Sequence, residues 1–155
     1  MSLAMTDLPQ TGRFDGRVHH LPVRIYYEDT DFSGVVYHAN YLRYFERARS
    51  DFFRAAGIHH AELAQRADPV AFAVTRMEID WAKPARIDDA LVVRTTFDRV
   101  TGARMFASQS ISRGEDLLCR ASVCAVVMGL DGRPRRPPPD IMRLLAAYLA
   151  PNPQA

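Results

Sequence analysis

Residues 26–41, YYEDTDFSGVVYHANY, carry three acidic side chains and one histidine among aromatic and apolar residues. An exposed loop seldom contains so many aromatic side chains, and a buried turn seldom contains so many carboxylates. Such a conflict between local preferences is typical of a functional site. The stretch lies between a predicted strand and a predicted helix, so the sequence predicts a turn that holds the site.

The segments on either side of this turn have different periodicities. From His20 to Glu28 the apolar residues partly alternate, which predicts a first strand. From Asn40 to Ala56 they recur at steps of three and four, which predicts a long helix. We expect Asn40 to be the N-cap of this helix and Gly57 to follow its C-terminus. A short helical piece is expected over residues 61–66.

The remainder of the chain is predicted to be mainly strands. They cover residues 70–81, 90–100, 104–112 and 117–128, and a short amphipathic helix at 141–148 follows a proline-rich linker at 134–139. One long helix and one antiparallel sheet have to bury their apolar faces against each other. The sequence therefore predicts an α+β domain over residues 18–150, with a curved sheet of about five strands around one helix. Residues 1–17 are predicted to be a disordered tail.

The composition is that of a globular protein. A chain of 155 residues is long enough for one domain with its own core, and a net charge of +2 provides no general attraction for nucleic acid. No apolar run reaches the roughly 20 residues of a membrane-spanning helix, and no signal peptide is visible. Cys119 and Cys124 should point to opposite faces of one strand, so we expect free thiols, no metal site and a cytoplasmic location.

The start of the predicted helix is suited to binding an anion. The first backbone N–H groups of a helix lack internal acceptors and lie at the positive end of its dipole, so they can stabilise an oxyanion. Gly34 permits a positive φ or a close backbone approach. A carboxylate beside these donors supplies half of an acyl-transfer site. On this argument Asp31, Asp29 and Glu28 are all candidates.

The pattern Asp31-x-x-Gly34-Val35-Val36-Tyr37-His38-x-x-Tyr41 resembles the active-site signature of the 4-hydroxybenzoyl-CoA thioesterase family of hotdog folds. The segments 46–49 (ERAR) and 84–89 (PARIDD) are similar to the Tol-Pal-associated acyl-CoA thioesterases of that family. The resemblance covers roughly residues 20–140. It implies a curved sheet wrapped around a central helix, and hydrolysis of an acyl-CoA thioester to a free acid and CoA.

The resemblance also implies roles for individual residues. Asp31 would act as nucleophile or general base, and the backbone N–H of His38 would polarise the thioester carbonyl. Tyr27 and the His38 side chain would complete the catalytic set, while Gly34 and Val35 would contact the substrate. CoA is part of the substrate, and neither a further cofactor nor a metal is implied.

Structural interpretations remain open for several of these residues. Asp31 could be a turn residue that bonds its own backbone, His38 could contribute only its N–H, and Tyr27 could belong to the core. Glu46 could pair with Arg49 at i, i+3 or could position His38 or Tyr27.

Lysine and arginine side chains are candidates for binding the CoA phosphates. Lys83, Arg86 and Arg104 are expected near the mouth of the pocket, because each is predicted to lie at an end of the sheet. Two other functions stay open: a hotdog dehydratase or hydratase, and a non-catalytic partner of envelope or lipid-synthesis machinery that could bind acyl carrier protein. An unpaired sheet edge and the family resemblance both predict a homodimer or homotetramer. The nature of the acyl group does not follow from the sequence.

Overall fold

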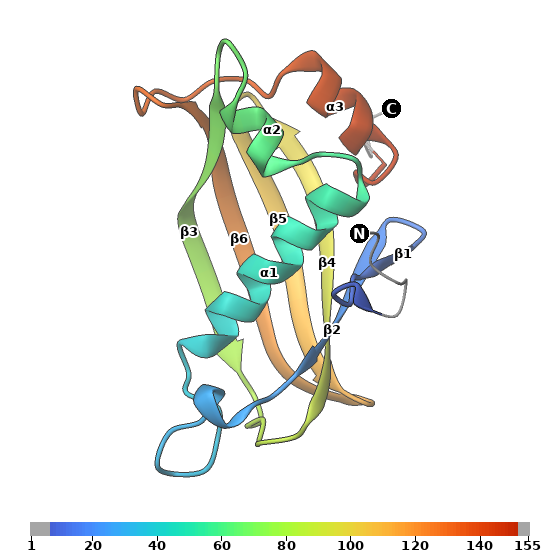
Figure 1. The fold of residues 1–155 in the computed structure, drawn as a ribbon, viewed down its shortest axis with the longest axis vertical. Coiled ribbons are helices and arrows are strands. Elements are labelled where there is room, and N and C mark those ends of the chain that lie inside the picture. The colour runs from blue at the N-terminus through green and yellow to red at the C-terminus, as the bar shows by residue number, and fades with distance from the viewer. Residues whose placement is uncertain (1–6, 152–155) are drawn as a thin grey trace.

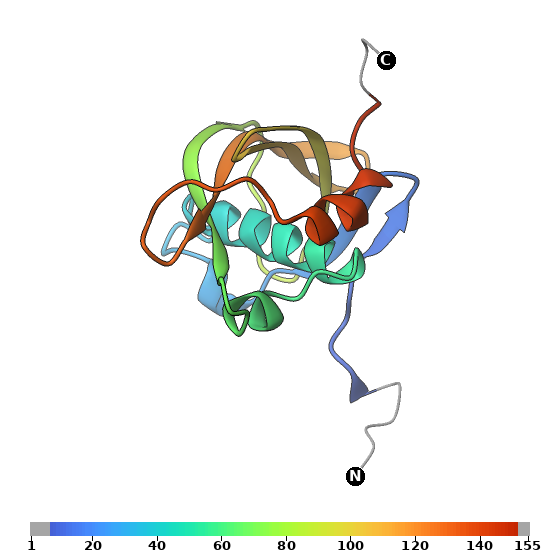
Figure 2. The ribbon, with the colours of Figure 1, turned by 90° about the horizontal axis from the view of Figure 1, so that it is seen from above.

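The computed structural model describes residues 7–151. One antiparallel sheet of six strands, in the order β1-β2-β4-β5-β6-β3, curves around helix α1 (Figures 1 and 2). The elements are β1 (Arg13–Asp15), β2 (Val18–Arg24), the 3-10 turn η2 (Tyr27–Asp29), α1 (Asn40–Ala55), α2 (His60–Ala64), β3 (Val70–Trp81), β4 (Ala90–Thr101), β5 (Arg104–Arg113), β6 (Asp116–Gly129) and α3 (Pro139–Ala146). The predicted helix and the strands after residue 70 are confirmed to within a few residues.

Helix α1 supplies the centre of the core. Phe45, Ala48 and Phe52 are fully buried, at the spacing of three and four that predicted the helix. The Phe52 ring meets Phe97 edge to face, with 4.8 Å between centroids. Aromatic pairs in this geometry stabilise a core beyond the area they bury. The helix is therefore held rigidly across the sheet, which fixes the position of its N-terminus.

The two ends of α1 differ in how well they were predicted. At the C-terminus, Gly57 has a φ of 92°, and its N–H bonds to the carbonyl of Arg54, as expected for a residue that ends a helix. At the N-terminus, the N-cap is Ala39 and Asn40 is the first helical residue. The prediction of Asn40 as N-cap is wrong because its side chain donates to the carbonyl of Asp29 instead, at 2.8 Å.

The N-terminal hairpin was not predicted. Residues 13–15 pair with residues 18–20, so the expectation of a disordered tail is wrong for this part, and the sheet has six strands rather than about five. Residues 1–6 lie outside the described residues. The first predicted strand ends at Arg24 rather than Glu28, because residues 27–29 turn into η2.

Strand β3 forms one edge of the sheet, and the three-residue strand β1 forms the other. The register of β3 with β6 shifts between Val74 and Arg76, so Thr75 is an extra residue in a β-bulge. Val74 opposes Ala125, and Met77 opposes Val123. Although Val74 and Met77 are three residues apart, the bulge lets both face α1. The apolar side of this edge strand consequently continues along its whole length, through Phe72, Val74, Met77, Ile79 and Trp81.

Cys119 is buried, Cys124 is partly exposed, and both thiols are free, which confirms the prediction from their spacing. Within residues 7–151, no helix is long and apolar enough to cross a membrane. The same part of the chain contains no group of three or more His, Cys, Asp or Glu side chains placed to hold a metal ion.

A buried histidine joins the N-terminal hairpin to α1. His19 is fully buried, and its Nε2 lies 2.8 Å from Oδ2 of Asp51. The same carboxylate oxygen accepts a hydrogen bond from the Gly12 N–H, also at 2.8 Å. Among the described residues Nδ1 of His19 has no partner, so a proton there would be buried without an acceptor. Burial lowers the pKa of His19 and outweighs the opposing effect of Asp51.

This lowered pKa predicts a pH dependence of stability. As pH falls, the unfolded chain takes up the His19 proton first, so the stability due to neutral His19 is present above the ordinary pKa of 6.5 and is lost as pH falls through it towards the folded value. We expect the Tm of the wild type, followed by circular dichroism, to fall more steeply below about pH 6.5 than that of His19→Gln. The exposed His59 provides the control, since His59→Gln should keep the wild-type slope. Identical slopes in all three proteins would contradict this assignment.

Candidate active site

The site lies in the loop between the end of strand β2 at Arg24 and the start of helix α1 at Asn40, at one end of the sheet. Two backbone hydrogen bonds close a tight turn in the connecting loop: Asp31 N–H donates to the Val35 carbonyl and Gly34 N–H donates to the Asp31 carbonyl, each at 3.0 Å. Gly34 has a φ of 83°, in the region that favours glycine. A Cβ at Gly34 would meet no atom within 4 Å, so the backbone conformation rather than lack of space requires glycine in this protomer.

Asp29 ties the two ends of the loop together. Its carboxylate accepts a hydrogen bond from the Tyr26 N–H at 2.8 Å, and its carbonyl accepts from the Tyr37 N–H at 3.0 Å and from the Asn40 side chain at 2.8 Å. Burial, and then the nearby Asp29 carboxylate, raise the pKa of the Tyr44 phenol on α1. Asp29 therefore acts as a scaffold residue of the loop.

Asp31 has a different environment. Its carboxylate is exposed and accepts hydrogen bonds from the Ser33 hydroxyl and from the Ser33 N–H, the latter at 2.8 Å. These two bonds favour the charged form and lower the pKa of Asp31, with a smaller contribution from His38. The structural interpretation of Asp31 as a turn residue is thus correct. The same two hydrogen bonds also orient the ionised carboxylate of Asp31, which remains exposed to a substrate.

The start of α1 supplies unpaired donors beside this turn. Within residues 7–151, the backbone N–H groups of His38 and Ala39 have no hydrogen-bond acceptor. They lie where the helix dipole favours negative charge. The His38 side chain is exposed, and its ring stands edge-on to Trp81 with 6.0 Å between centroids. The exposed imidazole of His38 therefore lies beside a backbone N–H that has no acceptor among the described residues.

Two hollows flank the loop. The Asp31 hollow is lined by Tyr27, Thr30, Asp31, Phe32, Gly34 and Ile87. The Trp81 hollow is lined by Val36, His38, Tyr41, Trp81, Ala82, Lys83 and Pro84. Tyr27 is 83% exposed, so its interpretation as a core residue is wrong, and it shares a hollow with Asp31. Val35 lies between the hollows, where it pairs with the backbone of Arg86.

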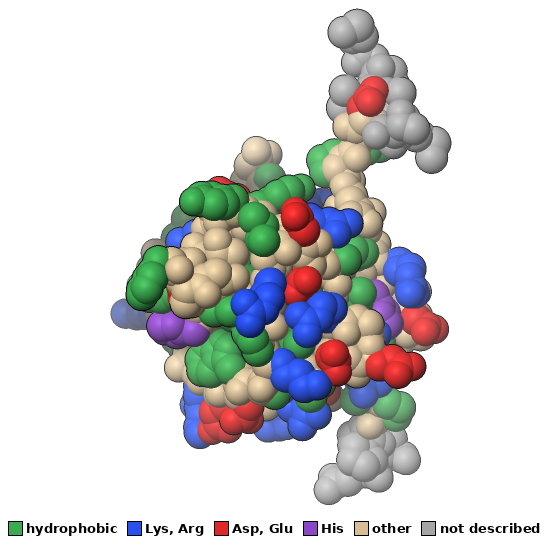
Figure 3. All heavy atoms as spheres, turned by 90° about the horizontal axis from the view of Figure 1, so that it is seen from below, with side chains coloured by type: hydrophobic (Ala, Val, Ile, Leu, Met, Phe, Trp, Pro, Cys, Tyr) green, Lys and Arg blue, Asp and Glu red, His purple; other side chains and the backbone are tan. Residues whose placement is uncertain are grey.

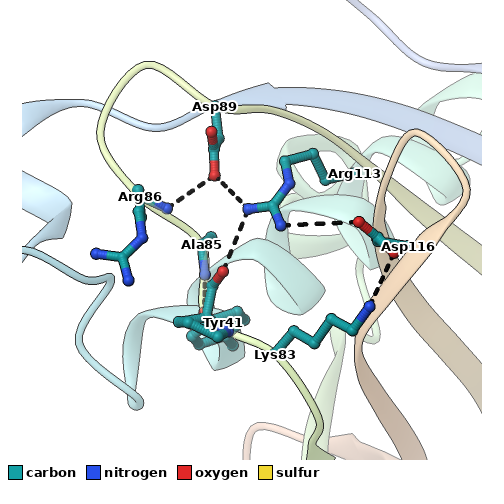
Figure 4. A network of polar contacts seen from close by, with 8 residues as sticks. Tyr41, Lys83, Ala85, Arg86, Asp89, Arg113 and Asp116 are labelled. Atoms are coloured by element: carbon teal, nitrogen blue, oxygen red, sulfur yellow. Dashed lines mark hydrogen bonds and ion pairs between the residues drawn. The ribbon is translucent and has the colours of Figure 1, made fainter.

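Ala85 connects the loop over residues 82–89 to α1. Its N–H donates to the Tyr41 hydroxyl at 2.9 Å, and its carbonyl accepts from the Val36 N–H, also at 2.9 Å. Tyr41 is only 2% exposed, and burial raises the pKa of its phenol. Figure 4 shows this contact beside the charged residues of the same sheet end. The two loops and the first turn of α1 therefore form one unit.

The three predicted phosphate-binding residues are not equivalent. Lys83 lies at the site, where its Nζ pairs with Oδ1 of Asp116 at 2.9 Å. Arg86 also lies there, and its side chain points away from Arg113 (Figure 4). Arg104 begins the 10-residue strand β5, so roughly 30 Å of strand separates it from this end of the sheet. Its predicted position is wrong within one protomer, because β5 runs back from the far end.

Arg113 was missed by the sequence analysis. It donates to Oδ2 of Asp89 at 2.8 Å and to the Pro84 carbonyl at 3.2 Å, so it supports the loop that carries Lys83. Figure 3 shows this end of the molecule from below, with basic and acidic side chains next to one another. The order of the strands could have predicted that Arg113 lies at the site. Since β4 begins at the site, its antiparallel neighbour β5 has to end there.

Glu46 and Arg49 form the expected ion pair along α1. Arg49 also donates to Oε1 of Gln109 at 2.9 Å, inside the core. Among the described residues, Glu46 makes no hydrogen bond with His38 or Tyr27. The alternative in which Glu46 positions either residue therefore has no support within this chain.

The profile described as "Thioesterase-like superfamily" matches residues 26–145. The chain belongs to this family. It is similar to the acyl-CoA thioester hydrolase YbgC of Escherichia coli O157:H7, with 41% identity over 123 residues that cover 78% of this chain and 90% of that protein. The acyl-CoA thioesterase YbgC of Haemophilus influenzae is 42% identical over 102 residues, or 66% of this chain and 74% of that protein.

Solved structures confirm the hotdog fold. A probable thioesterase from Bartonella henselae is 44% identical and superimposes with a TM-score of 0.76, covering 78% of this chain and 99% of that one. A 4-hydroxybenzoyl-CoA thioesterase in complex with 4-hydroxybenzoyl-CoA, 24% identical, has a TM-score of 0.75 and covers 83% of this chain and 98% of that one. The latter shares the fold.

The contacts of Asp31 predict the effect of removing the Ser33 hydroxyl. In Ser33→Ala the carboxylate loses the hydrogen bond that contributes most to its lowered pKa. We expect the pKa of Asp31, measured by NMR titration of the carboxyl carbon, to rise towards its ordinary value of 3.8. Ser110→Ala, on the outer face of the sheet, should leave it unchanged. An unaltered pKa in Ser33→Ala would mean that the backbone N–H alone holds the carboxylate.

Proposed function

We propose that this chain hydrolyses an acyl-CoA thioester to a free acid and CoA, with Asp31 as the catalytic carboxylate. One observation supports this most directly: an ionised, exposed carboxylate lies on the turn that leads into unpaired amides at the N-terminus of α1. This combination supplies a base or nucleophile together with donors for an oxyanion. The family and the names of the similar proteins point to the same reaction.

In the proposed mechanism the thioester carbonyl oxygen accepts a hydrogen bond from the His38 N–H, which stabilises the negative charge that develops there. Asp31 either takes a proton from the water that attacks the carbonyl carbon, or attacks the carbon itself to form a mixed anhydride that water then cleaves. In both routes the C–S bond breaks, and CoA leaves as a thiol after taking up a proton. The His38 imidazole and the Tyr27 hydroxyl orient the water or the acyl group.

Binding of CoA needs cations near the two hollows. Among the described residues Arg86 forms no ion pair, and its exposed side chain is available to a phosphate. Lys83 has to exchange Asp116 for the ligand, which costs little because both partners are about half exposed. Arg104 contributes only if another subunit brings it to the site. Gly34 and Val35 present backbone atoms to the substrate, and no further cofactor is proposed.

We also propose a homodimer as the minimal active unit, paired into a homotetramer. Strand β3 leaves one side of its backbone unpaired and has no proline within it, so its edge is open to another strand. Its exposed apolar residues Val74 and Trp81 would be covered when two copies pair about a two-fold axis. Association with the Tol-Pal system, acyl carrier protein as an alternative carrier and a cytoplasmic location stay predictions.

The catalytic proposal is tested by Asp31→Asn. Because the amide keeps the shape of the carboxylate but cannot accept the proton, we expect kcat to fall by about 10²–10⁴-fold without loss of fold. Thiol release from a panel of acyl-CoAs, followed with a chromogenic thiol reagent, measures the effect and separates hydrolysis from hydration of the acyl chain. Asp98→Asn, on the outer face of the sheet, is the control. Near-normal activity in Asp31→Asn, with loss in Asp29→Asn, would transfer the role to Asp29.

The assembly proposal is tested by light scattering on the purified protein. We expect a particle of at least twice the 17.5 kDa of one chain across the concentrations used for activity assays. Pairing through β3 would cover the open edge of the sheet. Because we propose the dimer as the minimal active unit, we expect the assembled form to be the one that hydrolyses the substrate. A particle of 17.5 kDa that stays fully active at micromolar concentration would refute the proposal.

A further inference from the structure

The His38 imidazole contacts aromatic rings rather than hydrogen-bond partners. The side chain is exposed, and among the described residues no group makes a hydrogen bond with it. Two rings lie against it instead. The centroid of the Tyr37 ring is 4.5 Å away, with the ring tilted by 58°, and the centroid of the Trp81 ring is 6.0 Å away, at 81°. Both nitrogens of the imidazole therefore remain available to water or to a substrate.

The two ring contacts differ in origin. Tyr37 directly precedes His38, so their contact is one between neighbours in the chain. Trp81 is the last residue of strand β3, and its contact with His38 exists only in the folded protein. Near-perpendicular rings whose centroids are about 4.5–7 Å apart attract each other. Trp81 therefore provides a restraint on His38 that the turn by itself does not contain.

The backbone on both sides of Trp81 is firmly held, although its side chain is 47% exposed. Trp81 pairs with the buried Cys119 of β6. The N–H groups of the next two residues both donate to the Leu118 carbonyl, at 2.8 and 3.1 Å. Further along the same loop, the Ala85 N–H is bound to the Tyr41 hydroxyl. The indole is thus attached to a fixed backbone, whereas the orientation of the imidazole depends on its neighbours.

The indole and the imidazole line the same hollow, the Trp81 hollow, which has a volume of about 270 Å³. The bulge at Thr75 keeps Trp81 on the side of β3 that faces α1. Without the indole, the hollow loses its wall on the side of β3. The imidazole of His38 could then rotate about χ1 into other staggered positions.

We infer that Trp81 is a positioning residue, whose ring confines the His38 imidazole to the orientation in which it holds the water or the acyl group. This inference rests on the proposed function and deepens it, because it names the residue through which the imidazole is placed. An aromatic contact favours one orientation by a factor of roughly 3–10. Since a misplaced orienting group lowers the rate, the loss of this contact should lower kcat by the same factor.

A double-mutant cycle tests the inference, with kcat and KM measured by thiol release from the acyl-CoA that the wild type hydrolyses fastest. We expect Trp81→Ala to lower kcat by roughly threefold to tenfold, and His38→Ala by about 10²-fold. The double variant should be as active as His38→Ala, because the indole has no further effect once the imidazole is gone. Trp81→Ala should leave KM unchanged, whereas a residue that binds the substrate would raise it.

Two further variants at Trp81 separate the ring contact from effects on folding. Trp81→Phe keeps a ring beside the imidazole and should retain kcat within about twofold. Trp81→Leu keeps an apolar side chain without a ring, so it should lose as much activity as Trp81→Ala. It also covers the case in which Trp81→Ala fails to fold.

Val74→Ala is the matched control for effects through assembly. Val74 lies on the same face of β3 and is 45% exposed, so a paired subunit would cover it as it would cover Trp81. It is seven residues, or roughly 23 Å of strand, away from Trp81 and should leave kcat unchanged. Light scattering should give the same particle for Trp81→Ala as for the wild type.

The outcomes separate the inference from the function on which it rests. Absence of thiol release by the wild type would overturn the proposed function, and full activity in His38→Ala would remove both the imidazole and Trp81 from it. With a slow His38→Ala, an unchanged kcat in Trp81→Leu, or losses that multiply in the double variant, would overturn the inference alone. So would an altered particle in Trp81→Ala or an equal loss of kcat in Val74→Ala, since either would assign the effect to assembly.

Discussion

The hydrogen bond from the Ala85 N–H to the buried Tyr41 hydroxyl is the contact on which the rest of the site depends. It fastens the loop after β3 to the first turn of α1, and the Ala85 carbonyl then holds Val36. Because Tyr41 sits in the core, the position of the loop is set by packing rather than by exposed charges. Of the surrounding ion pairs, Lys83–Asp116 is about half exposed and contributes little by comparison. The exposed side chains of Lys83 and Arg86 can thus move while the amides at the helix start remain fixed.

Asp29 and Asp31 have different structural environments because different groups donate hydrogen bonds to their oxygen atoms. The carboxylate and carbonyl of Asp29 bind groups from both ends of the loop, so this residue stabilises the loop. The Asp31 carboxylate accepts hydrogen bonds only from Ser33 of its own turn and remains exposed. The division follows from backbone geometry: the left-handed Gly34 turns the chain after Asp31 and returns it to the sheet. Chemical type alone would not distinguish the two residues.

Periodicity predicted α1 and the later strands because their apolar residues repeat with the pitch of the element that buries them. It failed for β1, because a strand of three residues is too short to show a period; its local signal is Gly16, which begins the two-residue turn to β2 with a φ of 59°. At the site, the resemblance singled out Asp31 and His38 as candidates, whereas the exposure of Tyr27 could be seen only in the structure. Arg113 could have been found by following strand direction, whereas the extra residue in β3 has no signature in local composition. Contacts between distant segments account for most of what the sequence did not reveal.

The bulge in β3 makes the apolar face of this strand sensitive to the number of residues in it. Side chains alternate along a strand, so one residue fewer at Thr75 would rotate half of the strand by one position. Either Phe72 and Val74 or Met77 and Ile79 would then face away from the helix, although every apolar residue would still be present. Deletion of one residue would thus interrupt the continuous apolar face of β3, which no single substitution would do. Among homologues, the length of this strand should therefore vary less than its composition.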